Sequence, residues 1–499
     1  MTRNVARSLA VVLAASLALF TSACAVPLAP GYRIVKESRD VQFVPGQPAE
    51  LRVRAHYTLQ NTGTEDLAFV DAIFPEEHAF GRTNLRVQVD GHDAPPTNLP
   101  AGYQEAEPDA LRIPLDPAWA RKQTLQLSIE YTLRSPENSG ARITIGGNSF
   151  HLGSRGWFPE LQPLKRVLAP YPKPPKVVDF SVRVPADFLL LAGGLPRGKK
   201  KDGNEIEYRF QLDSANNAPY VVAGKYVAWP ERRKTSTIFW TIQPLKGDPT
   251  SGAQQVAAAW NALEKDFGPL DKTITGPHIV ESPELRGHLS GETAPAAVAF
   301  LGGAIVNPAA LALGTSSDQF LEIVTHALAH EWFGDAMDIS PAAAVGMGEG
   351  FPEYATIVLD EARNGADARR KRVTQYLRAY DEAAKAATEA PLGAVMLGDA
   401  IGPRRIALAK APLFFVALED ACGEGPMRAG LAHLLAVQRG QEVGYADLRS
   451  ALEESSSRNL AGMFRLWLNQ KGIPEDFRQR YQGAAVGEVA QNRPTSSQR

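Results

Sequence analysis

Apolar and polar residues alternate along two segments in the first half of the chain. Apolar residues occupy every second position from Leu51 to Leu59, and the same alternation returns from Leu125 to Leu133. A period of two is typical of a strand with one buried face. Further strand-like runs begin near residues 141, 177, 205, 220 and 237, separated by clusters of Gly, Pro and Asn. The pattern predicts a large antiparallel β domain over residues 31–245.

The pattern changes to a helical period after residue 249. One face of an amphipathic helix is marked by five apolar residues: Val256, Ala259, Trp260, Leu263 and Phe267. A short β-like stretch follows around residues 273–280, and beyond it the chain reads mostly as helix. We therefore predict a second, mainly helical domain over residues 250–478 and a disordered polar tail over residues 483–499.

The first residues have the pattern of an export signal. Arg3 and Arg7 precede an apolar run over residues 9–20, and this run is too short to span a bilayer. We predict a signal segment over residues 1–24 and an exported protein, either in a bacterial periplasm or anchored to a membrane as a lipoprotein.

Cys24 stands where a bacterial lipoprotein carries its acylated cysteine. Two small residues precede it, but Thr21 occupies the position where such motifs usually have Leu. The alternative is ordinary cleavage after Ala23 or Ala25, without a lipid anchor. The other cysteine is Cys422, which we expect to be a buried structural thiol.

Composition excludes several functional classes. With 499 residues the chain is too long for one hydrophobic core. Its 44% hydrophobic and 22% charged residues are ordinary for a folded soluble protein and argue against a disordered or multi-pass membrane chain. The formal net charge is −2, and the sequence contains no block of basic residues. Nucleic acid is therefore not an expected partner.

A histidine pair with helical spacing is the strongest chemical signal. His326 and His330 are one turn apart on one helix face, so both imidazoles can reach one metal ion. Such a pair alone is more often two unrelated histidines. Glu349 lies 19 positions after His330, in a Gly-Glu-Gly-Phe segment, and could complete a His-His-Glu site with an open fourth position.

This segment resembles the gluzincin zinc aminopeptidases, the membrane alanyl aminopeptidase family. Their pattern is H-E-x-x-H followed after 18 residues by Glu, commonly HELAHQWFG and later NEGF; here the chain reads HALAHEWFG and GEGF. Looser likenesses lie at residues 217–224, 290–293 and 464–474. The resemblance implies an N-terminal β domain followed by a thermolysin-like, mainly helical zinc-peptidase domain. It also implies zinc on His326, His330 and Glu349.

Two positions depart from the family pattern. The residue after the first histidine is the family's general-base Glu and here is Ala327, whose methyl group cannot accept a proton. Glu331 follows His330 directly and is turned about 100° around the helix from that ligand. The family's oxyanion-stabilising Tyr aligns with Leu408, anchored only by Lys410 and the apolar run after it.

The resemblance assigns further roles. Glu292 matches the family's Glu that holds the substrate's free α-amine, although a surface loop carboxylate is the alternative. Glu353 lies one turn past Glu349, where it would either support a ligand or lie on a solvated helix face. Three phenols are possible substitutes for the missing Tyr, although nothing in the sequence places them near the metal: Tyr354, Tyr376 and Tyr380.

Three functions follow from these residues. The first is an exported zinc-binding protein with impaired or lost peptidase activity, whose partner is a peptide or a protein N-terminus. The second is an active zinc aminopeptidase with a substitute general base. The third is an envelope scaffold without metal. Zinc content separates the first from the third, and turnover separates the first from the second.

Overall fold

The computed structural model describes residues 31–74, 81–99, 110–134, 143–153, 157–161, 177–213, 220–229, 237–245, 249–270, 276–285, 297–300 and 302–481. The predicted signal segment with Cys24, the amine-binding candidate Glu292 and the predicted tail lie outside these residues.

The chain forms two compact units that interleave along the sequence. The first contains Met1–Pro136, Gly156–Ala186 and Gly194–Asn217, and the second contains Glu137–Arg155, Asp187–Gly193 and Ala218–Arg499. The predicted domains, 31–245 and 250–478, are contiguous segments, and their boundaries stay a prediction.

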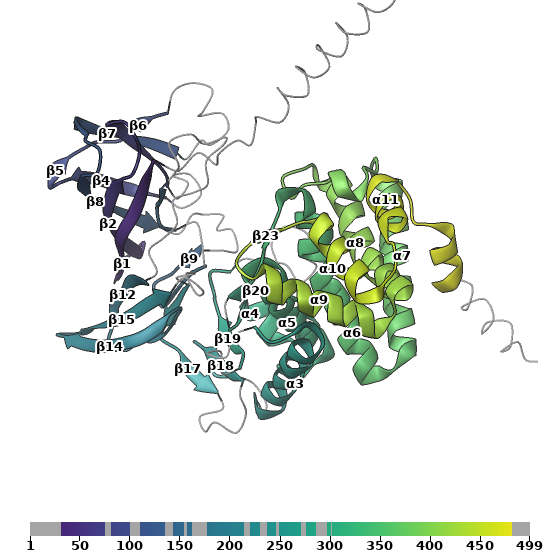
Figure 1. Cartoon of the computed structure of the whole chain (residues 1–499). Helices are drawn as coiled ribbons and strands as arrows, with labels where there is room; N and C mark the ends of the chain where they lie inside the picture. The colour runs from purple at the N-terminus through teal and green to yellow at the C-terminus, as the bar shows by residue number, and fades with distance from the viewer. Residues whose placement is uncertain are drawn as a thin grey trace, which may run out of the picture. The chain divides into compact units, whose positions relative to one another are not determined.

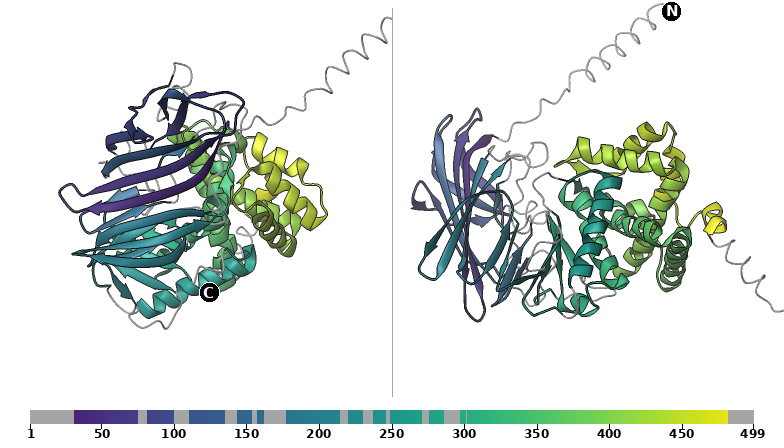
Figure 2. Two further views of the ribbon diagram at one scale, coloured as in Figure 1. Left: turned by 60° about the vertical axis from the view of Figure 1, so that its left-hand side comes forward. Right: turned by 90° about the horizontal axis from the view of Figure 1, so that it is seen from below.

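An eight-stranded sheet is the main element of the first unit. Its strand order is β14-β15-β12-β1-β2-β8-β4-β5, and its long strands lie side by side in the left view of Figure 2. The strands are β1 (Tyr32–Val44), β2 (Glu50–Asn61), β4 (Thr83–Val89), β5 (His92–Asp93), β8 (Thr124–Arg134), β12 (Val177–Pro185), β14 (Leu195–Asp202) and β15 (Glu205–Asp213). Every second residue of β2 is buried, which confirms the predicted alternation.

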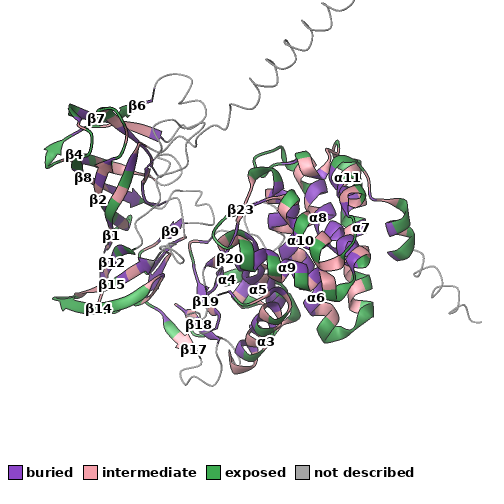
Figure 3. Ribbon diagram, viewed as in Figure 1, coloured by how far each residue is buried: buried purple, intermediate pink, exposed green. Residues whose placement is uncertain are grey.

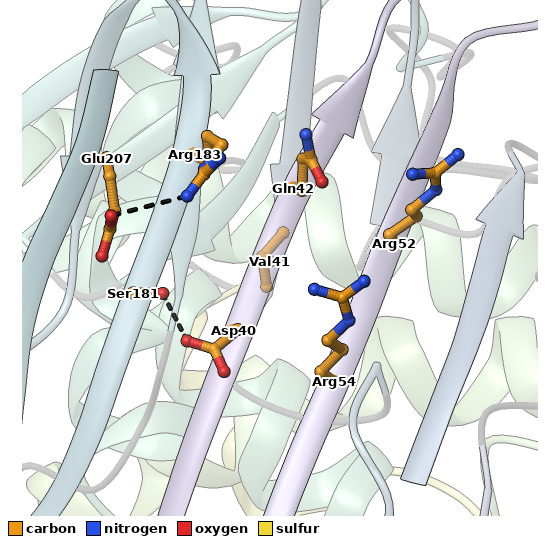
Figure 4. A pocket seen from close by; sticks show the side chains of 8 residues that line it. All are labelled: Asp40, Val41, Gln42, Arg52, Arg54, Ser181, Arg183 and Glu207. Carbon is orange, nitrogen blue, oxygen red and sulfur yellow. Dashed lines mark hydrogen bonds and ion pairs between the residues drawn. The ribbon is translucent and has the colours of Figure 1, made fainter. Parts of the chain in front are cut away.

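The solvent face of this sheet is polar and paired across strands. Arg54 on β2 lies 3.2 Å from Glu130 on β8, and Arg183 on β12 lies 3.5 Å from Glu207 on β15. Figure 4 shows Arg52, Arg54 and Arg183 among the residues that line a pocket on this sheet. The edge strand β14 is exposed along its whole length (Figure 3) and carries three lysines, a feature that discourages edge-to-edge pairing.

A second sheet completes the first unit. Its order is β11-β3-β7-β6, and its strands are β3 (Leu67–Ile73), β6 (Thr97–Asn98), β7 (Ala110–Trp119) and β11 (Glu160–Leu161). The Arg112 guanidinium on β7 donates to both carboxylate oxygens of Asp71 on β3, each at 2.9 Å, and this bidentate pair fixes the strands' register.

The second unit begins with strands rather than helices. One sheet has the order β13-β16-β10-β9 and the strands β9 (Ile143–Ile145), β10 (Ser149–Leu152), β13 (Leu189–Ala192) and β16 (Val221–Gly224). The other has the order β17-β18-β19-β21-β20 and the strands β17 (Val227–Trp229), β18 (Ile238–Thr241), β19 (His278–Glu281), β20 (Ala297–Phe300) and β21 (Gly303–Val306). The β20–β21 hairpin falls in the part predicted to be mostly helical, because four-residue strands are too short to show a period.

A two-stranded parallel sheet of β22 (Asp338–Ile339) and β23 (Glu442–Val443) follows, and helices form most of the rest of this unit (Figure 1). They are α3 (Pro249–Phe267), α4 (Pro308–Ala312), α5 (Asp318–Ala329), α6 (Gly350–Asn364), α7 (Ala366–Ala386), α8 (Ile401–Cys422), α9 (Glu424–Gln438), α10 (Tyr445–Ser456) and α11 (Ala461–Asn469). The predicted apolar face of α3 is buried at all five positions. Cys422, at the end of α8, is buried as expected. Among the described residues, no helix combines the length and the apolar character needed to cross a membrane.

His151 on β10 makes the second unit sensitive to acid. Its side chain is buried, and neither ring nitrogen has a hydrogen-bond partner among the described residues. Desolvation lowers the pKa of His151 from 6.5 to about 3. Between these two pH values the unfolded chain binds a proton that the folded chain excludes, so stability is complete above pH 6.5 and falls as the pH drops towards 3.

We therefore expect His151→Asn to flatten the pH dependence of stability. From pH 7.5 to pH 5 the natural protein should lose on the order of 2 kcal/mol more than the variant. Thermal unfolding of metal-free protein at both pH values measures this difference. His433→Asn removes an exposed histidine of the same unit and should behave like the natural protein. An equal loss in natural protein and His151→Asn would contradict the assignment.

Candidate metal centre

The helix α5 delivers both histidines to one place. Its N-cap residue is Ser317, whose hydroxyl accepts a hydrogen bond from the Phe320 amide at 3.1 Å, and Asp318 lies in its first turn. Its buried face contains Phe320, Leu321, Val324, Ala327 and Leu328. This packing leaves His326 in the last turn and His330 at the C-terminal cap, each with about a quarter of its side chain exposed.

A wide turn after α5 fixes the direction of the chain. The segment η1 (Glu331–Asp335) breaks regular helix at Gly334, whose φ of 151° favours glycine. Trp332 and Phe333 are buried, as expected for core residues: the Trp332 indole donates to the Gly268 carbonyl at 2.8 Å, and the Phe333 ring stacks on Phe351.

Glu349 reaches the histidines from a second segment. It is the last residue of η3 (Ala344–Glu349) and occupies the N-cap position of α6, without a side-chain capping hydrogen bond. The next residue, Gly350, lies so close to α8 that a Cβ atom there would be 3.0 Å from the Ala411 Cβ. This close packing of Gly350 against α8 fixes the position of the start of α6, and Glu349 is the residue directly before it.

The three predicted ligands converge with the geometry of a zinc site. The Nε2 atoms of His326 and His330 are 3.2 Å apart, and the Glu349 Oε2 lies 3.7 Å from each. Tetrahedral zinc with ligands at about 2.0–2.1 Å places neighbouring donor atoms about 3.4 Å apart. Among the described residues, these three form the group of His, Cys, Asp and Glu side chains close enough to share one ion. Two imidazoles and one carboxylate are the ligand types that zinc prefers.

A second carboxylate contacts His326 at Nδ1, the ring nitrogen on the side away from the other two ligands. The Glu353 Oε1 lies 3.1 Å from the His326 Nδ1, so Nδ1 is the protonated nitrogen and Nε2 is the metal-binding one. The Tyr376 hydroxyl on α7 donates a hydrogen bond to the Glu353 Oε2. Of the two alternatives for Glu353, the structure therefore supports contact with a ligand.

The charges of this group depend on one another. Burial lowers the pKa of His326, but Glu353 and Glu349 raise it, to about 9. Burial raises the pKa of Glu353, but His326 and Tyr376 lower it, to about 2. Burial lowers the pKa of His330. In the metal-free protein His326 and Glu353 thus form an ion pair, and zinc competes with one proton on His326.

The position that the resemblance assigns to a general base is occupied by a buried, closely packed residue. Ala327 is fully buried in the core of the second unit and offers no proton acceptor. Glu331 is also buried, and its Oε2 accepts a hydrogen bond from the Gly302 amide at 2.8 Å, beside the β20–β21 turn. Burial raises the pKa of Glu331 well above its usual range. Its carboxyl group is therefore bound to backbone.

The other sequence candidates lie elsewhere or face other partners. Leu408 on α8 is half-buried and packs against the apolar core. Tyr354 is buried with its ring stacked on Phe415, and Tyr380 lies under the guanidinium of Arg478. Tyr376 contacts Glu353, on the Nδ1 side of His326, away from the metal-binding Nε2. The contact made by Tyr376 was missed by sequence reasoning, since no local spacing links residues 326 and 376.

Comparison with known proteins agrees with this site. Residues 298–467 match the sequence model of the peptidase family M1 domain, and this segment contains all three ligands. No curated protein sequence matches the chain significantly.

Solved structures share the fold. An M1 zinc metallopeptidase from Deinococcus radiodurans matches with a TM-score of 0.60 and 16% identity, covering 89% of this chain and 95% of that one. A glutamate-to-alanine mutant of an M1 zinc metallopeptidase from that organism, bound to the substrate Tyr-Ser-Ala, matches with the same values. A two-domain M1 zinc metallopeptidase mutant bound to L-tryptophan matches with a TM-score of 0.60 and 16% identity, covering 89% of this chain and 96% of that one. Residues 298–467 therefore match the peptidase family M1 domain and bring His326, His330 and Glu349 together as a zinc-binding triad, in a chain that shares the fold of the two-domain M1 zinc metallopeptidases.

Proposed function

We propose that this chain is an exported zinc-binding protein that holds peptides or protein N-termini in an M1 peptidase site and hydrolyses them slowly or not at all. The observation that carries the proposal is the combination of a complete ligand triad with Ala327 at the general-base position. The export part rests on the charged and apolar pattern of residues 1–24.

Loss of the base affects hydrolysis more than binding. When bound, zinc supplies a Lewis acid with one open coordination position. Peptide hydrolysis also needs a group that takes a proton from the attacking water and delivers it to the leaving amine, a contribution of about 10²–10⁴-fold. Ala327 cannot do this, and the ligands hold the metal without it.

The carboxylates beside the ligands are already engaged. Glu353 accepts hydrogen bonds from His326 and Tyr376, and Glu331 accepts one from the Gly302 amide. Both carboxylates are held by these partners, and this favours impaired hydrolysis over a working enzyme with a substitute base.

The relatives indicate the class of ligand. The Deinococcus radiodurans mutant was solved with the tripeptide Tyr-Ser-Ala, and another mutant with L-tryptophan. Both ligands have a free α-amine, and we infer that Glu292 pairs with that amine in this chain. A bound peptide would then lie with its first peptide bond near the metal.

Peptide binding tests this proposal. Zinc-loaded natural protein should bind Tyr-Ser-Ala in isothermal titration calorimetry and release it intact. Acetylation of the peptide's N-terminus should weaken binding at least about tenfold, because the cationic amine is lost. Glu292→Gln should weaken binding of the free peptide but not of the acetylated one. Equal binding of both peptides by natural protein, or no saturable binding of either, would refute the proposal.

A further inference from the structure

The metal site is joined to a third helix through two parallel contacts. The helix α7 contacts α6 through the hydrogen bond from Tyr376 to Glu353, and it contacts α5 through Arg372, whose guanidinium lies 2.7 Å from the Glu322 carboxylate. Tyr376 follows Arg372 by one turn, and His326 follows Glu322 by one turn. The same stretch of α7 is therefore attached to both helices that carry the metal ligands.

The Glu353 carboxylate is held at both of its oxygens. Oε1 faces the His326 Nδ1 at 3.1 Å, and Oε2 accepts the Tyr376 hydroxyl. A carboxylate bound at one oxygen can still rotate, whereas one bound at both has a fixed plane. A fixed plane also fixes the imidazole of His326, because the Nδ1–H must point at Oε1. Its Nε2 then points at the position shared with His330 and Glu349.

We propose that Tyr376 is a positioning residue of the zinc site: acting through Glu353, it sets the orientation of His326 and thereby raises zinc affinity. Tyr376 does not contact the metal position, and its hydroxyl is the only group that the Tyr376→Phe substitution removes. The inference rests on the zinc triad but not on peptide binding, and metal affinity is measured without any peptide.

Zinc affinity, measured by competition with a chelating dye, tests this role. Tyr376→Phe should weaken zinc binding about tenfold, and Glu353→Gln by about 10–100-fold. In the Glu353→Gln background, Tyr376→Phe should add little, because the hydroxyl acts through that carboxylate. Tyr380→Phe removes a phenol one turn further along α7 and should leave zinc affinity unchanged.

A purely structural role of Tyr376 gives a different result. It would lower the unfolding temperature of the metal-free protein and leave zinc affinity and the visible absorption bands of the Co²⁺-substituted protein unchanged. The positioning role predicts altered Co²⁺ bands with a nearly unchanged unfolding temperature. Unchanged zinc affinity in Tyr376→Phe, additive losses in the double variant, or an equal loss in Tyr380→Phe would each overturn the proposal.

Discussion

Replacing Ala327 with glutamate should raise cleavage of aminoacyl reporter substrates by about 10²–10⁴-fold, the usual contribution of a general base. Ala327 follows the ligand His326 directly and precedes His330 on α5. A glutamate there would start from the helix that carries both histidines, and the expected gain requires its carboxylate to extend towards the open coordination position. Turnover should be measured per zinc-loaded, folded protein, because a larger side chain at this buried position costs about 1–3 kcal/mol of stability.

Matched variants show whether the gain comes from proton transfer. Ala327→Gln has nearly the shape of glutamate but cannot act as a base, so it should remain as slow as the natural protein. Adding Leu408→Tyr to Ala327→Glu should raise turnover further and non-additively if Leu408 occupies the oxyanion position, since both groups serve one transition state. An equal gain with Gln, or none with Glu, would mean that the site has changed in more than these two positions.

Removing one ligand should empty the metal site. The natural protein should carry close to one equivalent of zinc, whereas His330→Ala and Glu349→Ala should retain less than roughly a tenth of an equivalent at micromolar zinc, because two remaining ligands hold zinc poorly. Mass spectrometry of metals in purified protein measures this content. His433→Ala removes an exposed histidine remote in sequence from the triad and should keep its zinc.

Metal binding should also stabilise the folded protein against unfolding. Zinc bound to the folded chain but not to the unfolded one raises the unfolding temperature, and a chelator should reverse this rise in the natural protein. The two ligand variants should show no response to the chelator. A chelator response of natural size in Glu349→Ala would place the metal elsewhere.

The sequence was sufficient to predict those strands and helices whose residue pattern is local. The alternation in β2 and β8 and the apolar face of α3 were predicted and are confirmed, because one buried face imposes a period on the residues. The pairing of β10 with β16 was not predictable, since about 70 residues separate the two strands and neither is long enough to show which partner it prefers.

The residues of the metal site were likewise predictable only in part from the sequence. The spacing of His326 and His330 and the resemblance around Glu349 identified the ligands, and the structure brings them together. The contact from Tyr376 could not be foreseen, because it depends on how α7 packs on α6 and α5 and not on spacing along the chain. The roles given to Glu292 and Leu408 stay predictions that rest on the resemblance.

Zinc content and turnover of the natural protein, measured on one sample, test the central claim most directly. The protein is incubated with Tyr-Ser-Ala, and the release of free tyrosine is followed by mass spectrometry alongside a His330→Ala control. We predict close to one equivalent of zinc and no release above the control, because the ligands are present and Ala327 cannot accept a proton. Zinc-dependent release of tyrosine at a rate typical of enzymes, about 1–10³ per second, would contradict the account.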